Sequence, residues 1–396
     1  MSKIEQLIQQ YCPDGVEYKP LYSITEQFSG MAGVSNKWAE SGNCMFIDYM
    51  NVYKHLSVDT SALKYATVKS LNQNTLMTGD ILFTSASETP DECALSAVIE
   101  TDIQEGIFLD DHLFGLRLLD EYRTLISPSY LKYAFRSPCF RSQVRKVVRG
   151  VTRNYVSKTD FMKLTIPVPP LPVQEEIVRI LDTFAELQAE LQAELQKRLQ
   201  QYNYYRDNLL SFEGRTDVEW KKLGDVASIK TGTKPDLIMT TQTDFEYINA
   251  GTTNSGYTNL ANSDGDAITT PSRGQGGIGF VGYQRNPFWL GPLCYKIVST
   301  ENQLLTKYLY YFLVCHNDVI LTLKNTGGVP ALNRQDLVGI KIPIPPIMIQ
   351  QHIISILDRF DTLTNDLSQG LPAEIEARRK QYEYYRDQLL TFKQKA

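Results

Sequence analysis

Apolar side chains recur at helical spacing in two long segments of the chain. In the first segment, steps of three or four residues separate Ile177, Leu181, Phe184, Leu187, Leu191 and Leu195. The second begins with Ile353, Leu357 and Phe360 at the same steps. This spacing predicts amphipathic helices. Each segment follows a proline-rich stretch, IPVPPLP (166–172) or IPIPPI (342–347), and leads into a tyrosine-rich one, QYNYYRDNLLSF (201–212) or QYEYYRDQLLTF (381–392). The chain is therefore a tandem repeat of two halves.

Both helices are expected to be long. The prolines of 169–172 stiffen the entry to the first helix, because proline does not fit a helix interior. Residues 174–176 would then lie in its first turn, where the helix dipole favours negative charge. About forty residues would make a helix roughly 60 Å long. The second helix is expected to be interrupted at 370–372, with Pro372 in the first turn after the break. The two apolar faces would pack as an antiparallel pair; an ordinary helical hairpin within a core is the alternative.

A short repeat lies inside the first predicted helix. AELQAELQAELQ (185–196) contains the same four residues three times, where the second copy has LTNDLSQGLPAEIEARRK (363–380). Each unit would add just over one helical turn, about 6 Å of length. The repeat is therefore a candidate ruler, and a generic helix made of good helix formers is the alternative.

The remaining residues predict two strand-rich domains. VEYKPL (16–21) recurs as VEWKKL (218–223) and marks the start of each domain. Short apolar runs between turn-forming residues, such as GDILFTS (79–85) and LCYKIVS (293–299), are typical of strands. The predicted fold class is α+β. Its predicted parts are a domain at 1–165, a helix at 166–212, a domain at 213–341 and a helix at 342–396.

Composition narrows the functional classes. The 396 residues carry a net charge of −5, which argues against non-specific coating of nucleic acid but leaves room for a local basic face. The six cysteines form no CxxC motif and the four histidines are dispersed, so no metal site is expected and free thiols suit a reducing cytoplasm. The N-terminus does not resemble a signal peptide and no apolar run reaches membrane-spanning length. The expectation is a cytoplasmic protein with no membrane contact.

One basic face is predicted at residues 132–163. This interval holds nine Lys or Arg residues and one acid, a local charge of +8 (9 − 1), as expected of a surface that binds a polyanion. A solvated surface paired with acids from elsewhere is the alternative. The loop RGVTRN (149–154) and its counterpart KNTGGVPALNR (324–334) combine glycine with side chains suited to phosphate contact and base reading. The candidate nucleic-acid contacts are Arg136, Arg141, Arg145, Lys146, Arg149, Thr152, Arg153, Asn154, Ser272, Arg273, Gln275, Lys324 and Arg334.

Two motifs match catalytic signatures without the necessary setting. GQGGIG (274–279) matches a dinucleotide-binding pattern, but a strand and not a helix is predicted to follow it, so a hairpin loop is the better interpretation. NPFW (286–289) is similar to the amino-methyltransferase signature but lacks its second proline. No carboxylate pair, His/Cys constellation or GxSxG motif has a setting for catalysis. The chain is therefore not expected to be an enzyme.

The repeated motifs resemble those of the specificity (S) subunit of type I restriction-modification enzymes, over essentially the whole chain. The resemblance rests on the tandem layout, the IPxPP entries, the QxxIxxILD helix starts and the doubled QYxYYRDxLL. It implies two target recognition domains separated by two antiparallel conserved helices with pseudo-two-fold symmetry. Each domain would read one half of an asymmetric, interrupted site in double-stranded DNA. The short central repeat is similar to that of one branch of this family.

The resemblance also implies partners. Two methyltransferase (M) subunits would dock on the helices, restriction (R) subunits would join through them, and the S subunit would be non-catalytic. S-adenosylmethionine, ATP and Mg would bind to partner subunits, and no cofactor to this chain. The implied scaffold and subunit-interface residues are Ile177, Leu181, Phe184, Tyr202, Tyr205, Leu209, Ile353, Leu357, Phe360, Tyr382, Tyr385 and Leu389. The alternatives are a stand-alone DNA methyltransferase, whose cofactor motif is missing, and a structural coiled-coil adaptor with no nucleic-acid role.

Deleting one AELQ unit from 185–196 is expected to shorten the spacer between the two DNA half-sites. About 6 Å of helix corresponds to fewer than two base pairs of roughly 3.4 Å rise. Methylome sequencing of a host that carries the deletion variant reads the spacer and the half-sites together. Changed half-sites at an unchanged spacing would contradict the ruler.

Overall fold

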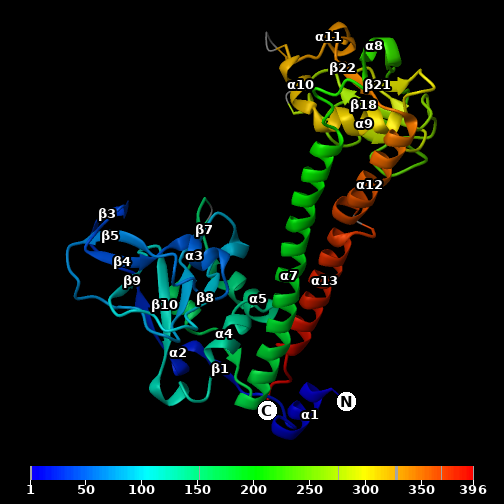
Figure 1. Ribbon diagram of the computed structural model, residues 1–396. Coiled ribbons are helices and arrows are strands. Elements are labelled where there is room, and N and C mark those ends of the chain that lie inside the picture. The colour runs from blue at the N-terminus through cyan, green and yellow to red at the C-terminus, as the bar shows by residue number, and fades with distance from the viewer. Residues whose placement is uncertain (1, 151, 275, 326–328, 367, 396) are drawn as a thin grey trace. The chain divides into compact units, whose positions relative to one another are not determined.

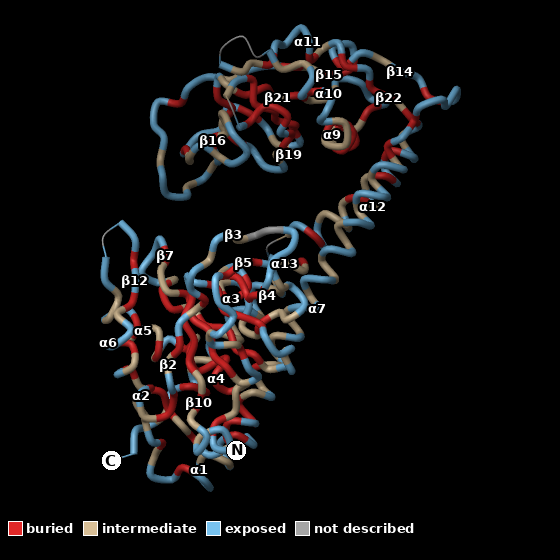
Figure 2. Tube along the Cα trace, turned by 90° about the vertical axis from the view of Figure 1, so that its left-hand side faces the viewer, coloured by how far each residue is buried: buried red, intermediate tan, exposed pale blue. Residues whose placement is uncertain are grey.

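The structure is a computed structural model that describes residues 2–150, 152–274, 276–325, 329–366 and 368–395. The chain folds into two compact units. Unit 1 contains residues 1–190 and 376–396, and unit 2 contains residues 191–375. This division cuts through both long helical segments, whereas the ranges predicted from the sequence keep each segment whole. Buried residues gather inside each unit, beneath exposed loops and helix faces (Figure 2).

The predicted long helices are confirmed. Helix α7 (Leu171–Leu209) is continuous over 39 residues. In the second copy, α12 (Ile347–Asn365) ends and α13 (Leu371–Leu389) resumes with Pro372 as its second residue. Gly370 lies at this break, where a Cβ atom would be only 2.4 Å from the Thr362 carbonyl oxygen. One detail differs from the expectation. Helix α7 begins at Leu171, so Pro172 lies in the first turn, where its missing N–H has no intrahelical acceptor to lose.

Unit 1 is built on antiparallel and mixed sheets. Its sheet orders are β1-β13, β2-β10-β6-β8, β3-β5-β4-β9 and β11-β12-β7. The β4–β9 pairing is parallel, and the other pairings are antiparallel. The elements are α1 (Lys3–Tyr11), β1 (Tyr18–Pro20), α2 (Leu21–Ile24), β2 (Thr25–Ser29), β3 (Val34–Ala39), β4 (Cys44–Ile47), α3 (Tyr49–Lys54), β5 (Lys64–Val68), β6 (Ile81–Thr84), β7 (Ala86–Ser87), β8 (Ser96–Val98), β9 (Ile107–Leu109), β10 (Leu113–Leu118), α4 (Pro128–Ala134), α5 (Pro138–Val147), β11 (Val148–Arg149), β12 (Asn154–Val156), α6 (Lys158–Phe161) and β13 (Thr165–Pro167).

Unit 2 repeats the central part of this arrangement. Its orders β14-β22 and β15-β21-β18-β19 match β1-β13 and β2-β10-β6-β8, while β17-β16-β20 differs from the outer sheets of unit 1. The predicted α+β class and the tandem repeat are thus confirmed (Figure 1). The elements are β14 (Glu219–Lys222), α8 (Leu223–Val226), β15 (Ala227–Thr231), β16 (Phe245–Ile248), β17 (Tyr257–Thr258), β18 (Ala267–Pro271), β19 (Gly282–Gln284), β20 (Trp289–Leu290), β21 (Cys294–Ser299), α9 (Thr306–Cys315), α10 (Asn317–Thr322), α11 (Arg334–Val338) and β22 (Lys341–Ile344).

A buried glutamine fixes the start of each conserved helix to its own unit. Gln174 is fully buried; its Nε2 donates to the carbonyl oxygens of Leu125 and Pro169, and its Oε1 accepts from the Ser127 N–H. Gln350 is also fully buried and makes the same three bonds, to the Gln303 and Pro345 carbonyls and from the Leu305 N–H. The sequence had suggested that Gln174 interacts with the α7 dipole. In the structure, its amide joins loop backbone groups instead.

A second set of hydrogen bonds joins each conserved helix to a neighbouring helix of the same unit. In unit 1, the Tyr133 hydroxyl and the Lys132 ammonium, 3.0 Å away, donate to the Asp182 carboxylate. In unit 2, the Tyr311 hydroxyl and the Lys307 ammonium donate to Asp358, with a Lys–Asp distance of 2.7 Å. Burial, followed by the bond to aspartate, raises the pKa of each tyrosine far above its usual range.

Each unit also contains one antiparallel contact between helices of the two copies (Figure 1). In unit 1, the first part of α7 lies against the last part of α13, where the rings of Phe184 and Tyr385 stack with centroids 5.4 Å apart. In unit 2, the last part of α7 lies against α12, where Tyr205 and Phe360 stack at 5.6 Å. The predicted antiparallel packing is confirmed within each unit.

Gln350→Ala is expected to destabilise unit 2 by roughly 3 kcal/mol, because the Leu305 N–H and the Gln303 and Pro345 carbonyls would lose a buried hydrogen-bond partner. Hydrogen exchange at the Leu305 amide, together with urea unfolding, measures the loss. The matched control is Gln351→Ala, an exposed neighbour that is expected to change stability by less than about 0.5 kcal/mol. Equal losses of stability in the two variants would contradict the stabilising role of the Gln350 hydrogen bonds.

Candidate nucleic-acid and subunit interfaces

The basic loop of unit 1 is a tight hairpin between β11 and β12. Gly150 adopts φ +113°, and a Cβ atom there would lie 2.1 Å from the Arg153 carbonyl oxygen. Only glycine fits this position without strain. The side chains of Arg149, Thr152 and Arg153 are exposed on the hairpin, so the loop presents two guanidinium groups and a hydroxyl to solvent.

Several cations of the basic interval are already paired with acids. Arg149 Nη2 lies 2.7 Å from Asp160 and Lys163 Nζ lies 3.0 Å from the same carboxylate. The hydrogen bond from Lys163 lowers the pKa of Asp160. Arg145 pairs with Asp91 at the surface. Among the described residues, no side-chain hydrogen bond or ion pair is found for Lys146 and Arg153, so these two exposed cations are the most available to an anionic ligand.

Three of the predicted contacts are committed to the interior of unit 1. The Arg136 guanidinium donates to the carbonyls of Ser96 and Val52, and burial lowers its pKa to about 10. Arg141 donates to the carbonyls of Asp91, Cys93 and Ala94, and burial lowers its pKa to about 10 as well. The buried Asn154 amide donates to the Glu88 carbonyl. These bonds use donors that phosphate contact would need. The structure therefore gives these three residues a structural role in place of the predicted nucleic-acid contact.

Unit 2 brings two of its candidate loops together, although the bonded residues lie almost sixty positions apart in the sequence. Gly274 N–H donates to the Pro330 carbonyl at 3.1 Å, and Leu332 N–H donates to the Ser272 carbonyl at 2.9 Å. Arg273 is exposed, Lys324 is half-buried and Ser272 is buried. Arg334 is exposed, but its Nε donates to the Ile229 carbonyl. Gln275 lies outside the described residues.

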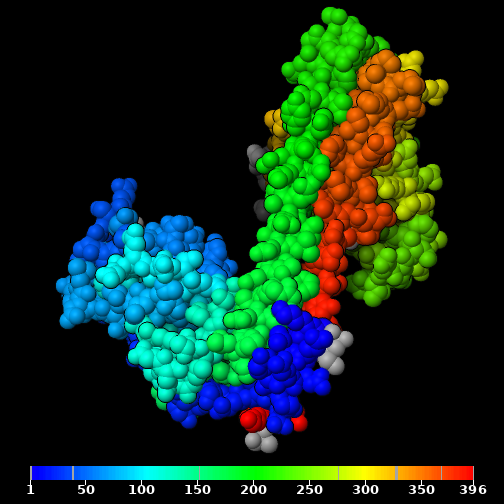
Figure 3. All heavy atoms as spheres, turned by 60° about the horizontal axis from the view of Figure 1, so that its bottom comes forward, coloured from blue at the N-terminus to red at the C-terminus, as the bar shows by residue number. Residues whose placement is uncertain are grey.

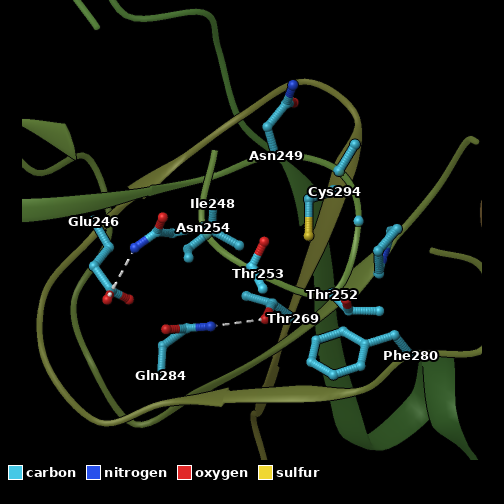
Figure 4. Close-up of a pocket in the computed structure, with 13 residues that line it drawn as sticks. Glu246, Ile248, Asn249, Thr252, Thr253, Asn254, Thr269, Phe280, Gln284 and Cys294 are labelled. Carbon is cyan, nitrogen blue, oxygen red and sulfur yellow. Dashed lines mark hydrogen bonds between the residues drawn. The ribbon is translucent and has the colours of Figure 1, made fainter. Parts of the chain in front are cut away.

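The GQGGIG segment joins β18 to β19, which pair antiparallel. The predicted hairpin loop is confirmed, since the described residues on both sides of the segment form antiparallel strands. Beside it lies a pocket that sequence reasoning missed. Figure 4 shows Asn254 bonded to Glu246 at 3.3 Å and Gln284 bonded to Thr269 at 3.1 Å on one side of this pocket. Phe280 forms its apolar wall and is 38% exposed. These residues come from four separate segments, which explains why no motif signals them.

Asp110, Asp111 and His112 form a cluster of possible metal ligands. The Lys37 ammonium lies within this cluster, 2.9 Å from Asp110 and in contact with Asp111. A lysine at this point supplies the positive charge that a cation would bring. The cluster therefore serves as an ion-pair network that ties β3 to the turn before β10.

The predicted scaffold residues divide into two groups. The fully buried ones belong to the cores of the two units: Ile177, Leu181, Ile353 and Leu357. Leu389 is buried in the core of unit 1 and Leu209 is partly buried against that of unit 2. The aromatic ones lie where helices of the two copies meet: Phe184, Tyr202, Tyr205, Phe360, Tyr382 and Tyr385. Tyr204 and Tyr384, which the sequence analysis did not single out, are 66% and 62% exposed.

A groove in unit 2 lies beside the end of α7. Leu210, Trp220, Phe312 and Val319 line it together with Arg206. Trp220 is 39% exposed at this groove. Charged side chains, among them Asp207, Glu213 and Asp318, also line this groove, so its surface is both apolar and polar.

The model of the type I restriction modification DNA specificity domain matches residues 13–201 and 216–377. The chain belongs to this family. The two matches correspond to the two repeats seen in the sequence, and together they cover most of the chain. Among the described helices, none is both long and apolar enough to cross a membrane.

Curated relatives of this chain are described as type I specificity subunits. The specificity subunit of the type I restriction enzyme EcoR124I/EcoR124II of Escherichia coli is 38% identical over 267 residues, which are 61% of this chain and 66% of that subunit. A putative type I specificity subunit of Mycoplasma pneumoniae is 32% identical over 246 residues, 59% of this chain and 98% of that protein.

Solved structures show the same fold over nearly the whole chain. The S subunit of a type I restriction-modification system from M. genitalium aligns with TM-score 0.61 and 15% identity, covering 95% of this chain and 96% of that one. The HsdS subunit from Thermoanaerobacter tengcongensis aligns with TM-score 0.51 and 16% identity, covering 96% and 97%.

If Arg153 and Arg149 contact DNA phosphates, Arg153→Ala and Arg149→Ala are each expected to weaken DNA binding by the assembled complex and to reduce the slope of log affinity against log salt by about 1, because each would remove one phosphate contact. Binding titrations at several salt concentrations measure both quantities. Arg215→Ala removes the same charge from an exposed site paired with Asp217 and serves as the control. An unchanged affinity and salt slope would remove the arginine concerned from the interface.

Proposed function

We propose that this protein is the DNA sequence-recognition subunit of a type I restriction-modification complex. Each unit reads one half of a bipartite, asymmetric site in double-stranded DNA, and the conserved helices dock methyltransferase subunits. The observation that carries the proposal is the duplicated scaffold, in which β2-β10-β6-β8 and β15-β21-β18-β19 share one order while the outer sheets and loops differ. Identical supports with different loops suit the reading of two different sequences.

The proposed DNA contacts are the exposed cations and amides of the variable loops. In unit 1 they are Lys146, Arg149, Thr152 and Arg153 on and beside the β11–β12 hairpin. In unit 2 they are the exposed Arg273, two residues after the pocket-lining Pro271, and the pocket residues Asn254 and Gln284. Cations that neutralise phosphates give affinity, and amides that bond to base edges give sequence selectivity.

Two methyltransferase subunits would dock on the conserved helices, and restriction subunits would join through them. Exposed tyrosines at Tyr204 and Tyr384 support this assignment, since tyrosine is enriched in protein interfaces. The chain is proposed to be non-catalytic and to act in the cytoplasm. S-adenosylmethionine, ATP and Mg would bind to the partner subunits.

Two observations disfavour the alternatives. A stand-alone methyltransferase needs a strand–glycine–helix cofactor site, whereas the glycine-rich segment of this chain joins antiparallel strands. A structural adaptor does not need two different sets of polar loops on one scaffold.

The test is to exchange the variable part of unit 2. A variant in which residues 227–304 are replaced by the corresponding residues of another member of the family is assembled with methyltransferase subunits, and the methylated sites are sequenced. We expect one half-site to change while the other half-site and the spacer stay the same, because unit 1 is untouched. Methylation at both original half-sites, or loss of selectivity at both, would contradict the proposal.

A further inference from the structure

Both of the larger sheets of unit 2 contribute to one pocket. Glu246 comes from β16 of one sheet, whereas Thr269 and Gln284 come from β18 and β19 of the other. Figure 4 shows Glu246, Asn254 and Gln284 on one side of the pocket and Phe280 on the opposite side. Figure 3 shows the yellow-green segment around residue 250 at the outer surface of unit 2. The pocket therefore has a polar wall and an aromatic wall, and a ligand can reach it from solvent.

A glycine leaves free space between these two walls. A Cβ atom at Gly282 would lie 3.2 Å from the Phe280 ring, 3.5 Å from the Gln284 amide nitrogen and 2.9 Å from the Thr269 hydroxyl. Gly282 is not one of the positive-φ glycines, so its backbone conformation does not require glycine. A glycine inside a strand marks a place where another group approaches the backbone closely. A flat ligand can lie over β19 at this position.

The volume of the pocket selects a single ring. It is about 150 Å³, which is about the volume of a protein cavity that accepts benzene. A six-membered ring therefore fits, whereas a fused pair of rings is too large. Cys294 and Pro271 form a buried floor. Burial raises the pKa of the Cys294 thiol to about 12, so the floor is neutral.

The polar wall selects the edge of that ring. Among the described residues that line the pocket, Glu246 alone carries a charge, and a carboxylate accepts hydrogen bonds and repels anions. Gln284 donates one amide hydrogen to Thr269 and has a second one to donate to a ligand. Of the two single-ring bases of DNA, cytosine presents an amino donor, whereas thymine presents an oxygen acceptor at the same place. Cytosine is therefore the matched ligand.

We propose that this pocket binds one cytosine base that has left the stack of the DNA duplex. The ring would lie against Phe280, above Gly282. Its amino group would donate to Glu246, and its ring nitrogen would accept from Gln284. A base outside the duplex is held in this way, by stacking and by bonds to its pairing edge. Arg285, exposed next to Gln284, would pair with a phosphate of the extruded nucleotide.

The proposal deepens the proposed function and rests on it for the source of the base. The size of the pocket and the chemistry of its walls are independent of that function. Reading a base edge in a groove leaves the base pair closed, whereas this pocket requires the pair to open. Opening a pair costs a few kcal/mol, and the two modes of recognition therefore respond differently to DNA in which the pair is already broken.

The first test measures DNA binding by the assembled complex. In the half-site that unit 2 reads, each guanine is replaced in turn by an abasic residue, which leaves the opposite cytosine unpaired. One replacement is expected to strengthen binding at least about tenfold, because the cost of opening is removed. Phe280→Ala is expected to abolish this gain. Leu260→Ala removes an exposed apolar side chain outside the pocket, and this matched control should keep the gain. No gain at any position, or an equal gain in Phe280→Ala, would overturn the inference.

The second test asks which base enters. Glu246→Gln is expected to admit thymine as well as cytosine at that one position, because a neutral amide can donate to the thymine oxygen. Sequencing the methylated sites of a host that carries the variant reads this change. Asp264→Asn removes an exposed carboxylate outside the pocket and should leave the methylated sequence unchanged. An unchanged sequence in Glu246→Gln as well would contradict the role of the carboxylate and overturn the inference.

Free cytidine is the probe for a ligand that does not come from DNA. If cytidine binds the complex, Phe280→Ala abolishes this binding and no abasic replacement gives a gain, the pocket belongs to a nucleoside and the extruded base is refuted. Absence of any sequence-selective DNA binding by the wild-type complex would refute the proposed function itself. Selective binding without the gain would refute the inference alone, which separates the two conclusions.

Discussion

A fully satisfied, buried glutamine is the constraint on which each half of this protein depends. Gln174 and Gln350 are completely buried, and a buried amide with missing partners is costly. Each amide binds one carbonyl of its own proline-rich entry and one carbonyl and one N–H of the loop before the adjacent helix. These bonds fix the start of each conserved helix to its own unit, independently of the sequence of the outer loops.

The hydrogen bonds to Asp182 and Asp358 show which residues of this contact the two copies share and which differ between them. Both aspartates, Asp182 and Asp358, accept a tyrosine hydroxyl and a lysine ammonium. The lysines come from different places: Lys132 directly precedes Tyr133, whereas Lys307 lies four residues before Tyr311. Either position brings an ammonium to the equivalent aspartate, because residues four apart share a helix face and a lysine side chain is long enough to reach the carboxylate from the adjacent position. The charge balance is retained while the exact residue that provides it varies.

The sequence predicted the long helices, the break before Pro372 and the tandem α+β units, because helical periodicity and repeated motifs are local signals. It could not predict how side chains are used. Arg136 and Arg141 look like cations of a binding surface, yet their guanidinium groups hold backbone carbonyls inside unit 1. The pairing of the loop at Ser272 with that at Leu332, and the pocket of Asn254 and Gln284, depend on contacts between distant segments. No spacing along the chain reveals such contacts.

Each copy also contributes the end of its conserved helix to the core of the other copy's unit. The core of unit 1 includes Leu389 and Leu390 from the end of the second copy, and the core of unit 2 includes Leu210 and Phe212 from the end of the first. A copy separated from its partner would lose these apolar side chains and expose the surface they cover. Neither repeat is therefore complete in its own residues. Loops can diverge between the copies, but the QYxYYRDxLL segments must keep their shape, because each of them belongs to the core of the other copy's unit.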